Sequence, residues 1–376
     1  MKILFICSIF FVAYAYLGYP ISLFLFGLVH KKTVKKLEYF PVISLIITVH
    51  NEEIRIREKL NNTFLISYPK DKFEILVVSD GSTDDTNKII LEYQESGVTL
   101  IPVSERKGKE NAQKYAVERA KGDILIFSDV ATLLEPGSLK QIVSNFADPS
   151  VGCVSGEDRV IHHGGNLSGE GLYVQYEMML RRLETKVHSL VGLSGSFFAA
   201  RKEVCRDFSG ELQSDFRTVM NSMRMGLRAI SDPEALGYYK DISSSTREFD
   251  RKVRTVLRGL TVFFRNLEFL NIARYGFYSY QYFCHKLLRW LVPVFLIAIF
   301  ISNIFIMDLN RVYLLLFVLQ LVFYGYGIFR NIKISKSLSL IGKIPVYFIT
   351  VNTSILLAWW KYLKGERIVM WKPSER

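Results

Sequence analysis

Short aliphatic runs alternate with longer amphipathic segments through the first third of the chain. Four such runs stand at 42–49, 75–78, 98–103 and 124–127. A continuous aliphatic run is typical of a strand that is buried on both faces, and the segments between the runs have the length and periodicity of helices. Strands that alternate with helices in this way predict a mostly parallel α/β sheet with right-handed connections.

Much longer apolar stretches lie toward both ends of the chain. The first, at 3–29, has no charged residue and is long enough to cross a bilayer. A signal peptide is the alternative, but the apolar part is too long and no clear cleavage site closes it. Two further candidate spans stand at 290–307 and 312–329. The sequence therefore predicts membrane segments on both sides of the α/β unit.

Basic residues give these segments an expected orientation. Lys31, Lys32, Lys35 and Lys36 follow the first span directly, and the positive-inside rule places such a flank in the cytoplasm. The segment at 337–360 is interrupted by the sequence GKIP. As a full span it would export the basic tail, so we favour an interfacial or re-entrant segment.

These patterns divide the chain into five parts. A stretch at 249–270 is a basic amphipathic helix, which could lie on the anionic membrane surface, take part in a site, or do both. The expected parts are an N-terminal transmembrane helix at 1–30, an α/β domain at 40–247, interfacial amphipathic helices at 248–282, C-terminal transmembrane segments at 288–360 and a cytoplasmic basic tail at 361–376.

Charge and cysteine content narrow the expected partners. The formal net charge of +12 points to anionic partners, namely nucleic acid, lipid headgroups or a phosphorylated substrate. The sequence carries no recognisable nucleic-acid-binding motif, so we expect no nucleic acid partner. The four cysteines are scattered without close pairs, which indicates a reducing compartment and no metal knuckle.

Polar residues follow the predicted strands where each of them ends. The sequence HNEE follows the first strand, Asp80 follows the second and Asp129 the fourth, and a basic loop that ends in Lys109 lies between them. Carboxyl ends of parallel strands meet at one edge of a sheet, where nucleotides bind. Helix capping can explain either aspartate singly, but it explains the set poorly. The sequence predicts a site for a nucleotide diphosphate at this edge.

Taken together, the motifs HNEE, VVSDGSTDDT, KGK and FSD resemble those of family 2 glycosyltransferases of GT-A fold. The resemblance covers roughly residues 40–260. The flanking apolar segments are similar to those of the integral-membrane subgroup that includes hyaluronan, cellulose and poly-N-acetylglucosamine synthases. The resemblance implies a Rossmann-like cytoplasmic domain that binds a nucleotide-sugar donor, with UDP as the expected nucleotide, and a fifth strand at 152–156.

The resemblance also implies roles for the residues on the donor side. Val49, Glu52 and Asp80 would hold the nucleobase and ribose, and a carboxylate such as that of Asp80 can accept the uracil N–H. Lys109 would face the diphosphate as a point charge on a flexible stem. A solvated helix start is the alternative interpretation of this lysine.

The metal-binding motif of the family is expected to be incomplete in this chain. Asp129 matches the first acid of the DxD motif that holds Mg²⁺ or Mn²⁺ against the diphosphate. Ala131 stands where the second acid would be. Thr132 or a water molecule could complete the set of ligands.

On the acceptor side, the resemblance implies a turn under the acceptor sugar at Ser194, Gly195 and Ser196. Asp215 aligns with the catalytic base, although Ser214 replaces the first acid of the family's ED or DD motif. An inverting transfer requires one carboxylate to take the proton of the acceptor hydroxyl. Asp215 is therefore the expected catalytic residue.

A second acceptor element is expected on the basic amphipathic helix. Arg251 and Arg254 fall where processive synthases carry Q-x-x-R-W. Only Arg254 matches that motif, because Arg251 replaces the glutamine and Thr255 replaces the tryptophan. The resemblance implies that the two arginines orient the acceptor and the diphosphate.

We therefore expect a multi-pass inverting glycosyltransferase of the plasma membrane, with a cytoplasmic catalytic domain that serves cell-surface polysaccharide synthesis. Its acceptor would be a glycan or a lipid-linked molecule. Membrane lipids would surround its apolar segments. The sequence is also compatible with an oligomer or with a partner subunit. One alternative is a single-addition transferase on a polyprenyl-linked acceptor. Another is a catalytically silent membrane scaffold, which the replaced acids favour and the retention of Asp80, Asp129 and Asp215 opposes.

Overall fold

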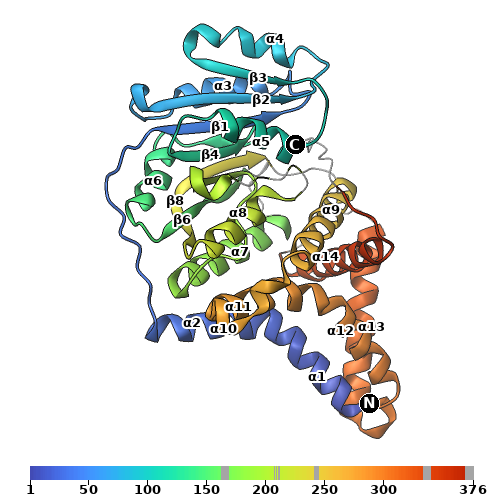
Figure 1. Cartoon of the computed structure of the whole chain (residues 1–376). Helices are drawn as coiled ribbons and strands as arrows, with labels where there is room; N and C mark the ends of the chain where they lie inside the picture. The colour runs from blue at the N-terminus through green and yellow to red at the C-terminus, as the bar shows by residue number, and fades with distance from the viewer. Residues whose placement is uncertain are drawn as a thin grey trace.

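The computed structural model places an α/β unit above a group of long apolar helices (Figure 1). The two parts meet along helices α7 (Gly169–Val187) and α9 (Ser245–Phe264). The described residues are 1–161, 169–206, 208, 210, 212–240, 245–332 and 340–368.

The first half of the sheet is parallel, as the aliphatic runs predict. Strand β1 lies between β2 and β4, β3 lies outside β2, and these pairs are all parallel. The strands are β1 (Ile43–Val49), β2 (Phe73–Asp80), β3 (Val98–Val103) and β4 (Ile124–Asp129). The runs in β1, β2 and β4 are buried because helices cover both faces, whereas β3 forms the edge of the sheet and alternates between buried and exposed residues.

The second half of the sheet is mixed. Strand β7 is antiparallel to both β4 and β6, β8 is parallel to β6, and β5 is antiparallel to β8. These strands are β5 (Leu133–Leu134), β6 (Val151–Ile161), β7 (Phe197–Arg201) and β8 (Arg228–Lys240). Only β6 was expected, because β7 is short and β8 contains charged residues and a proline. The expected α/β class with a mostly parallel sheet is confirmed.

Helices cover the two faces of the sheet with separate apolar clusters. Helices α3, α4 and α6 pack on one face, whereas α5, α8 and α9 pack on the other. Their bounds are α3 (Ile56–Phe64), α4 (Thr86–Leu91), α5 (Lys109–Arg119), α6 (Ser138–Ser144) and α8 (Ser214–Arg224).

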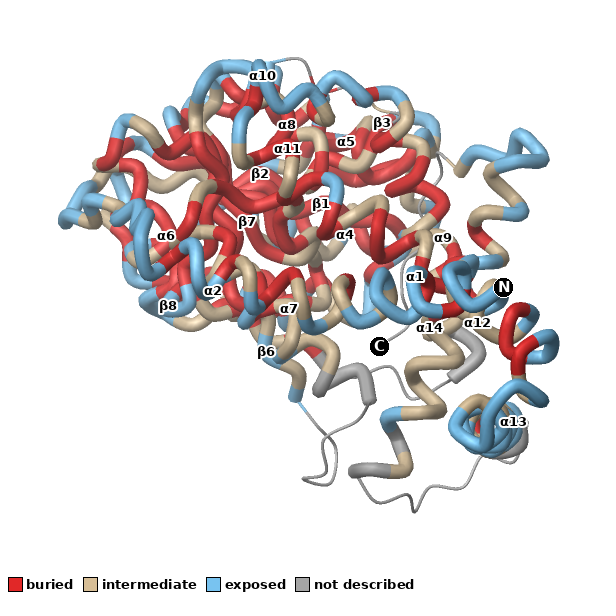
Figure 2. Tube along the Cα trace, turned by 90° about the horizontal axis from the view of Figure 1, so that it is seen from below, coloured by how far each residue is buried: buried red, intermediate tan, exposed pale blue. Residues whose placement is uncertain are grey.

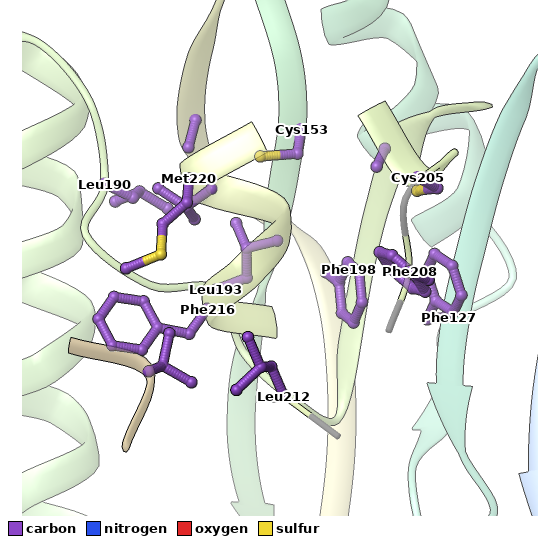
Figure 3. Close-up of a cluster of buried hydrophobic side chains, with 14 of the residues drawn as sticks. Phe127, Cys153, Leu190, Leu193, Phe198, Cys205, Phe208, Leu212, Phe216 and Met220 are labelled. Carbon is purple, nitrogen blue, oxygen red and sulfur yellow. The ribbon is translucent and has the colours of Figure 1, made fainter. Parts of the chain in front are cut away.

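The cluster on the α5 and α8 face holds the site in place. The rings of Phe127 and Phe198 stack 4.6 Å apart between β4 and β7. Leu193 and Phe216 belong to the same cluster and are almost fully buried (Figure 3). Leu193 precedes the loop that carries Ser194, and Phe216 follows Asp215. Burial of these two side chains fixes both segments against the sheet.

Three helices have the length and composition to cross a membrane, as judged over the described residues. The first, Lys2–Val29, consists of α1 (Lys2–Ala13), a π-helical turn and α2 (Tyr19–Val29). The third lies within α13 (Arg311–Ile332). Helices α1 and α13 show mostly exposed side chains (Figure 2). An apolar surface of this kind is typical of contact with lipid.

The second candidate span begins earlier than the sequence predicts. It runs from Phe277 to Ile304 through α11 (Phe277–Tyr282), a π-helical turn and α12 (Arg289–Ile304). The helix therefore extends beyond the predicted span at its N-terminal end, where His285 and Arg289 pair with acids of α7. A short helix, α10 (Ile272–Tyr275), stands before it.

Helix α14 (Leu340–Leu363) continues through Pro345, where the sequence predicts an interruption. It packs against α9 and α13. It is not among the three candidate spans found in the described residues. An interfacial position for this segment stays a prediction, and the end of the basic tail, at 369–376, lies outside the described residues.

Two acids of α7, the fully buried Glu184 and the largely buried Glu177, join the sheet to the apolar helices. Glu184 accepts hydrogen bonds from Tyr19 of α2 (2.6 Å) and pairs with His285 (2.6 Å). Glu177 pairs with Arg289 of α12 at 2.6 Å and lies 3.4 Å from His285. Burial alone would raise the pKa of Glu177, but the positive charge of Arg289 and the hydrogen bonds from His285 and Arg289 hold that pKa well below its usual value. The network thus joins α7 to α2 and to the second candidate span, three segments that are distant in the sequence.

We predict that Glu177→Gln destabilises the protein by about 3–5 kcal/mol, because it leaves the charge of Arg289 buried without its partner. Thermal unfolding in detergent measures the effect. Glu234→Gln is the control, since the Glu234 side chain is 65% exposed in its pair with Lys36. Equal melting temperatures for wild type and Glu177→Gln would contradict the prediction.

The same pair predicts a pH dependence. A carboxyl whose folded pKa is depressed stabilises the protein above its unfolded pKa, which is about 4.3 for glutamate. That contribution is lost as the pH falls through the lower, folded pKa of Glu177. On acidification from pH 7, the melting temperature of the wild type should therefore approach that of Glu177→Gln.

Candidate functional site

The turns after β1 and β2 are bonded to each other at the carboxyl edge of the sheet. The Asn51 side chain accepts a hydrogen bond from the amide of Thr83 (2.8 Å), and the amide of Glu52 donates to Thr86 Oγ1 (2.7 Å). Asn51 has φ = 51°, a left-handed conformation that asparagine tolerates better than most residues. Val49 ends β1 directly beside Ser79. These bonds hold the two motifs side by side.

Glu52 is buried within this edge and forms a two-bond pair with Arg55, with both distances 2.7 Å. Burial raises the pKa of Glu52, and Arg55 partly offsets the effect. The carboxylate is therefore held in a fixed orientation beneath the first turn.

Asp80 organises the basic loop that precedes α5. Its two carboxylate oxygens accept hydrogen bonds from the amides of Lys107 (2.9 Å) and Gly108 (2.8 Å), and its carbonyl oxygen lies 2.7 Å from His50 Nδ1. The carboxylate is 1% exposed. Both oxygens thus have backbone partners, a contact set that sequence motifs do not reveal. Asp80 fixes the basic loop that ends in Lys109, the residue that is expected to face the diphosphate.

Lys109 connects the ends of β4 and β7. Its ammonium pairs with Asp129 and donates to the carbonyl of Gly195 at 2.9 Å. The amide of Asp129 donates to the carbonyl of Ser196 at 2.9 Å. The donor-side residues Lys109 and Asp129 therefore contact the same loop that carries the expected acceptor residues Gly195 and Ser196.

A second lysine lies beneath Asp129. Lys59 of α3 is fully buried, and its ammonium donates to Ser128 Oγ (2.7 Å) and to the carbonyl of Thr132. Burial lowers the pKa of Lys59 to about 7, against the opposing effect of the Asp129 charge. The only signal for this residue in the sequence is the position of a lysine on the inner face of an amphipathic helix. It holds the segment from Ser128 to Thr132 on the sheet.

The residues around Asp129 offer little to a metal ion on their own. Among the described residues there is no group of three His, Cys, Asp or Glu side chains that could hold one. Thr132 Oγ1 is buried without a hydrogen-bond partner, and Ala131 has no ligand atom. The set fits Mg²⁺ or Mn²⁺ if Asp129 is one ligand and the diphosphate oxygens of a nucleotide complete the shell.

The loop at 192–196 is the centre of the site. Asp158 of β6 accepts hydrogen bonds from Ser194 Oγ (2.8 and 2.7 Å) and from Ser196 Oγ (2.5 Å). The amide of Ser194 donates to Ser155 Oγ at 2.8 Å. These bonds leave the loop with a fixed path across the top of β6 and β7.

Asp215 stands in the first turn of α8, against this loop. Its Oδ1 accepts from the amide of Phe216 (2.9 Å). A Cβ atom built on Gly195 would lie 3.2 Å from Asp215 Oδ2. The absence of a side chain at Gly195 therefore leaves room beside this oxygen, which a hydroxyl could use.

A cavity of about 360 Å³ opens from Asp215 toward the apolar helices. It is bounded by α7, α9, the π-helical turn at Phe283–Leu288, α12 and α14. Ser194, Gly195, Asp215 and Arg251 line it, as the sequence predicts for an acceptor site. Ser196 and Arg254 are not among the lining residues.

Arg254 instead lies near two other arginines of α9, Arg251 and Arg258. Burial lowers the pKa of Arg254, and so do the charges of Arg258 and Arg251. Arg258 forms a buried ion pair with Glu110, the residue after Lys109. Helix α9 is thereby attached to the start of α5 on the donor side. A role for Arg254 with the diphosphate stays a prediction.

Residues 44–208 match the family model described as Glycosyl transferase family 2. A probable glycosyltransferase of Bacillus subtilis, YdaM, is 25% identical over 291 residues, which are 72% of this chain and 68% of that protein. Poly-β-1,6-N-acetyl-D-glucosamine synthase of Staphylococcus aureus is 25% identical over 183 residues. That match covers 47% of this chain and 44% of the synthase, less than half of its length.

One solved structure resembles the whole chain. A mannosyltransferase of Pyrobaculum calidifontis, in complex with GDP-Man and Mn²⁺, aligns with a TM-score of 0.72 over 97% of this chain and 100% of that one. Its sequence identity is 22%, so the likeness concerns the fold. The GT-A fold expected from the sequence motifs is confirmed.

We predict that Asp80→Ala lowers nucleotide affinity at least tenfold, because the amides of Lys107 and Gly108 lose their acceptor and the basic loop is released. Calorimetry with UDP and with GDP on the detergent-solubilised protein measures this. Asp85→Ala is the matched control, since Asp85 is exposed in the same turn. Unchanged affinity for both nucleotides in Asp80→Ala would remove Asp80 from the site.

Metal binding should depend on the nucleotide. With a single carboxylate at Asp129, Mn²⁺ is expected to bind at least tenfold more weakly without UDP or GDP than with it. Ala131→Asp should raise the affinity for Mn²⁺ alone by supplying a second acid. Calorimetric titrations of both proteins test this. Tight Mn²⁺ binding by the wild type in the absence of nucleotide would contradict the expectation, as would full activity in EDTA.

Proposed function

Because residues 44–208 form a family 2 glycosyltransferase domain of GT-A fold, we propose that this chain is a membrane-bound inverting transferase. It moves a sugar from a nucleotide donor to a glycan or lipid-linked acceptor in cell-surface polysaccharide synthesis. The observation that carries the proposal is the position of Gly195. Its carbonyl accepts from Lys109, which pairs with Asp129, and its Cα side faces Asp215.

The donor occupies the carboxyl edge of β1, β2 and β4. The turns that hold Val49, Glu52 and Asp80 bind the nucleoside, and UDP is the proposed nucleotide. Lys109 faces the diphosphate, on which negative charge builds as its bond to the sugar breaks. Asp129 would hold Mg²⁺ or Mn²⁺ there, and the ion would supply Lewis-acid stabilisation of that leaving group.

Asp215 acts as the general base. A carboxylate next to the open side of Gly195 can accept the proton of an acceptor hydroxyl as its oxygen attacks the sugar carbon. The acceptor reaches Asp215 through the cavity between α7, α9 and α12. Arg251, which lines this cavity, orients the acceptor, and Arg254 stabilises the diphosphate from α9.

The three candidate spans support attachment to the membrane, where lipids surround α1 and α13. We propose the plasma membrane, with the α/β domain in the cytoplasm, from the lysines that follow the first span. The buried contacts of Asp80, Lys109 and Asp215 form a connected set, which favours an enzyme over a catalytically silent scaffold.

For Asp215→Asn we predict intact nucleotide binding and a transfer rate lower by roughly 10²–10⁴. The asparagine keeps the shape and the bond to the Phe216 amide but cannot take a proton. Calorimetry measures binding, and transfer of labelled sugar to membrane acceptors measures turnover. Asp250→Asn, an exposed position on α9, serves as the control. Wild-type turnover in Asp215→Asn would show that Asp215 is structural.

A further inference from the structure

Two cations in the cavity beyond Asp215 have no role in the function described so far. Lys286 lies in the π-helical turn that precedes α12, and Arg181 lies in the middle of α7. Both line the cavity together with Asp215. Among the described residues, neither has a carboxylate within ion-pair distance.

Lys286 points at the loop at 192–196. A Cβ atom on Gly192 would lie 3.3 Å from its ammonium nitrogen, and that nitrogen is 4.9 Å from the centre of the Phe216 ring. The negative charges of Glu177 and Asp215 and the positive charges of Arg289 and Arg181 all act on it from beyond ion-pair distance. An aromatic ring stabilises an ammonium only modestly, so the charge still lacks a hydrogen-bonding anion.

Arg181 contacts the same loop through hydrogen bonds. Its guanidinium donates to Ser155 Oγ (3.0 Å) and to the carbonyl of Leu193 (3.2 Å). Both acceptors are neutral. The guanidinium is therefore held in a fixed place while its charge remains uncompensated, which is a suitable arrangement for binding a phosphate.

The neighbouring cations of the cavity are compensated, which sets these two apart. Arg289 pairs with Glu177 at 2.6 Å, and Lys252 pairs with Glu248 at 2.8 Å. Lys286 and Arg181 are both partly buried, so less water is available to stabilise their charges than at the protein surface. Two such cations near one loop indicate that an anion belongs between them.

The far side of the cavity is apolar. Val256 of α9, Trp290 of α12, and Val351 and Ile355 of α14 line it. Trp290 and Ile355 are 9% and 5% exposed. The cavity thus presents cations near Asp215 and hydrocarbon toward the apolar helices, a polarity that matches a molecule with a charged head and an apolar chain.

We propose that Lys286 and Arg181 bind a phosphate ester of the acceptor, on the membrane side of Asp215. This inference rests on the proposed function and adds to it the chemical class of the acceptor. The phosphate contacts the two cations near Gly192, the apolar chain of a lipid-linked acceptor lies along α12 and α14, and the group that receives the sugar reaches Asp215 past Gly195.

Binding of a short prenyl monophosphate to the full chain in detergent tests the proposal, with calorimetry as the readout. The wild type should bind it at least tenfold more tightly than the matching prenyl alcohol. Lys286→Gln and Arg181→Gln should each remove most of that difference, and Lys286→Arg should keep it. Arg182→Gln is the matched control, because Arg182 neighbours Arg181 but pairs with Glu157.

Further ligands distinguish the sources of the phosphate. If inorganic phosphate or a hexose phosphate binds to the wild type and not to Lys286→Gln, the anion site is supported and its phosphate comes from a soluble molecule. If only the prenyl phosphate binds, the phosphate belongs to a lipid. Equal affinity for prenyl phosphate and prenyl alcohol, or equal affinity in wild type and both glutamine variants, would overturn the proposal.

Nucleotide binding in the same samples separates this inference from the proposed function. Variants that bind UDP or GDP as the wild type does have kept their fold and their donor site. A variant can bind nucleotide normally and still lose the difference in affinity between prenyl phosphate and prenyl alcohol. Such a variant has lost the anion site alone. A wild type that binds prenyl phosphate but neither nucleotide would contradict the proposed function and leave the anion site standing.

Discussion

The buried acids of α7 are the constraint on which the arrangement of this molecule depends. Glu177 and Glu184 cannot stay charged inside the protein without partners. The partners come from α2 and from the second candidate span, as Tyr19, His285 and Arg289. Satisfying two carboxylates therefore brings both ends of the chain against the α/β domain. The cavity beside Asp215 exists between these elements because the network holds them there.

The loop at 192–196 brings the candidate site residues of the different elements together. It takes its position from Asp158 and Ser155 beneath it and from the buried Leu193 beside it. Its carbonyl groups then receive Lys109 and the amide of Asp129, while Gly195 leaves space at Asp215. The proposed donor and acceptor sides meet across a single residue without a side chain. A transfer between two bound molecules requires such proximity.

The sequence predicted the elements that are encoded within a few neighbouring residues, and it missed the features that form by contact between distant segments. Aliphatic runs identified β1 to β4, and strand-end motifs placed Asp80 and Asp129 at one edge of the sheet, because each signal lies within a few residues. Asp215 was expected only from the resemblance to family 2 glycosyltransferases, and its role stays a prediction. Strand β7 and the cavity depend on contacts between distant segments. Lys286 was placed outside the span, although charges in an apolar stretch are a signal of function. The amide partners of Asp80 and the burial of Lys59 can be recognised only in the folded structure.

Label transfer from a panel of UDP- and GDP-sugars tests the central claim most directly. Membranes that contain the full chain would be incubated with each radiolabelled donor, and the product would be sized and extracted with organic solvent. We expect at least one donor to label a membrane-retained product, and membranes without the chain to give none. If no donor of either class transferred label above that background, the claim that this chain is a membrane glycosyltransferase would be contradicted.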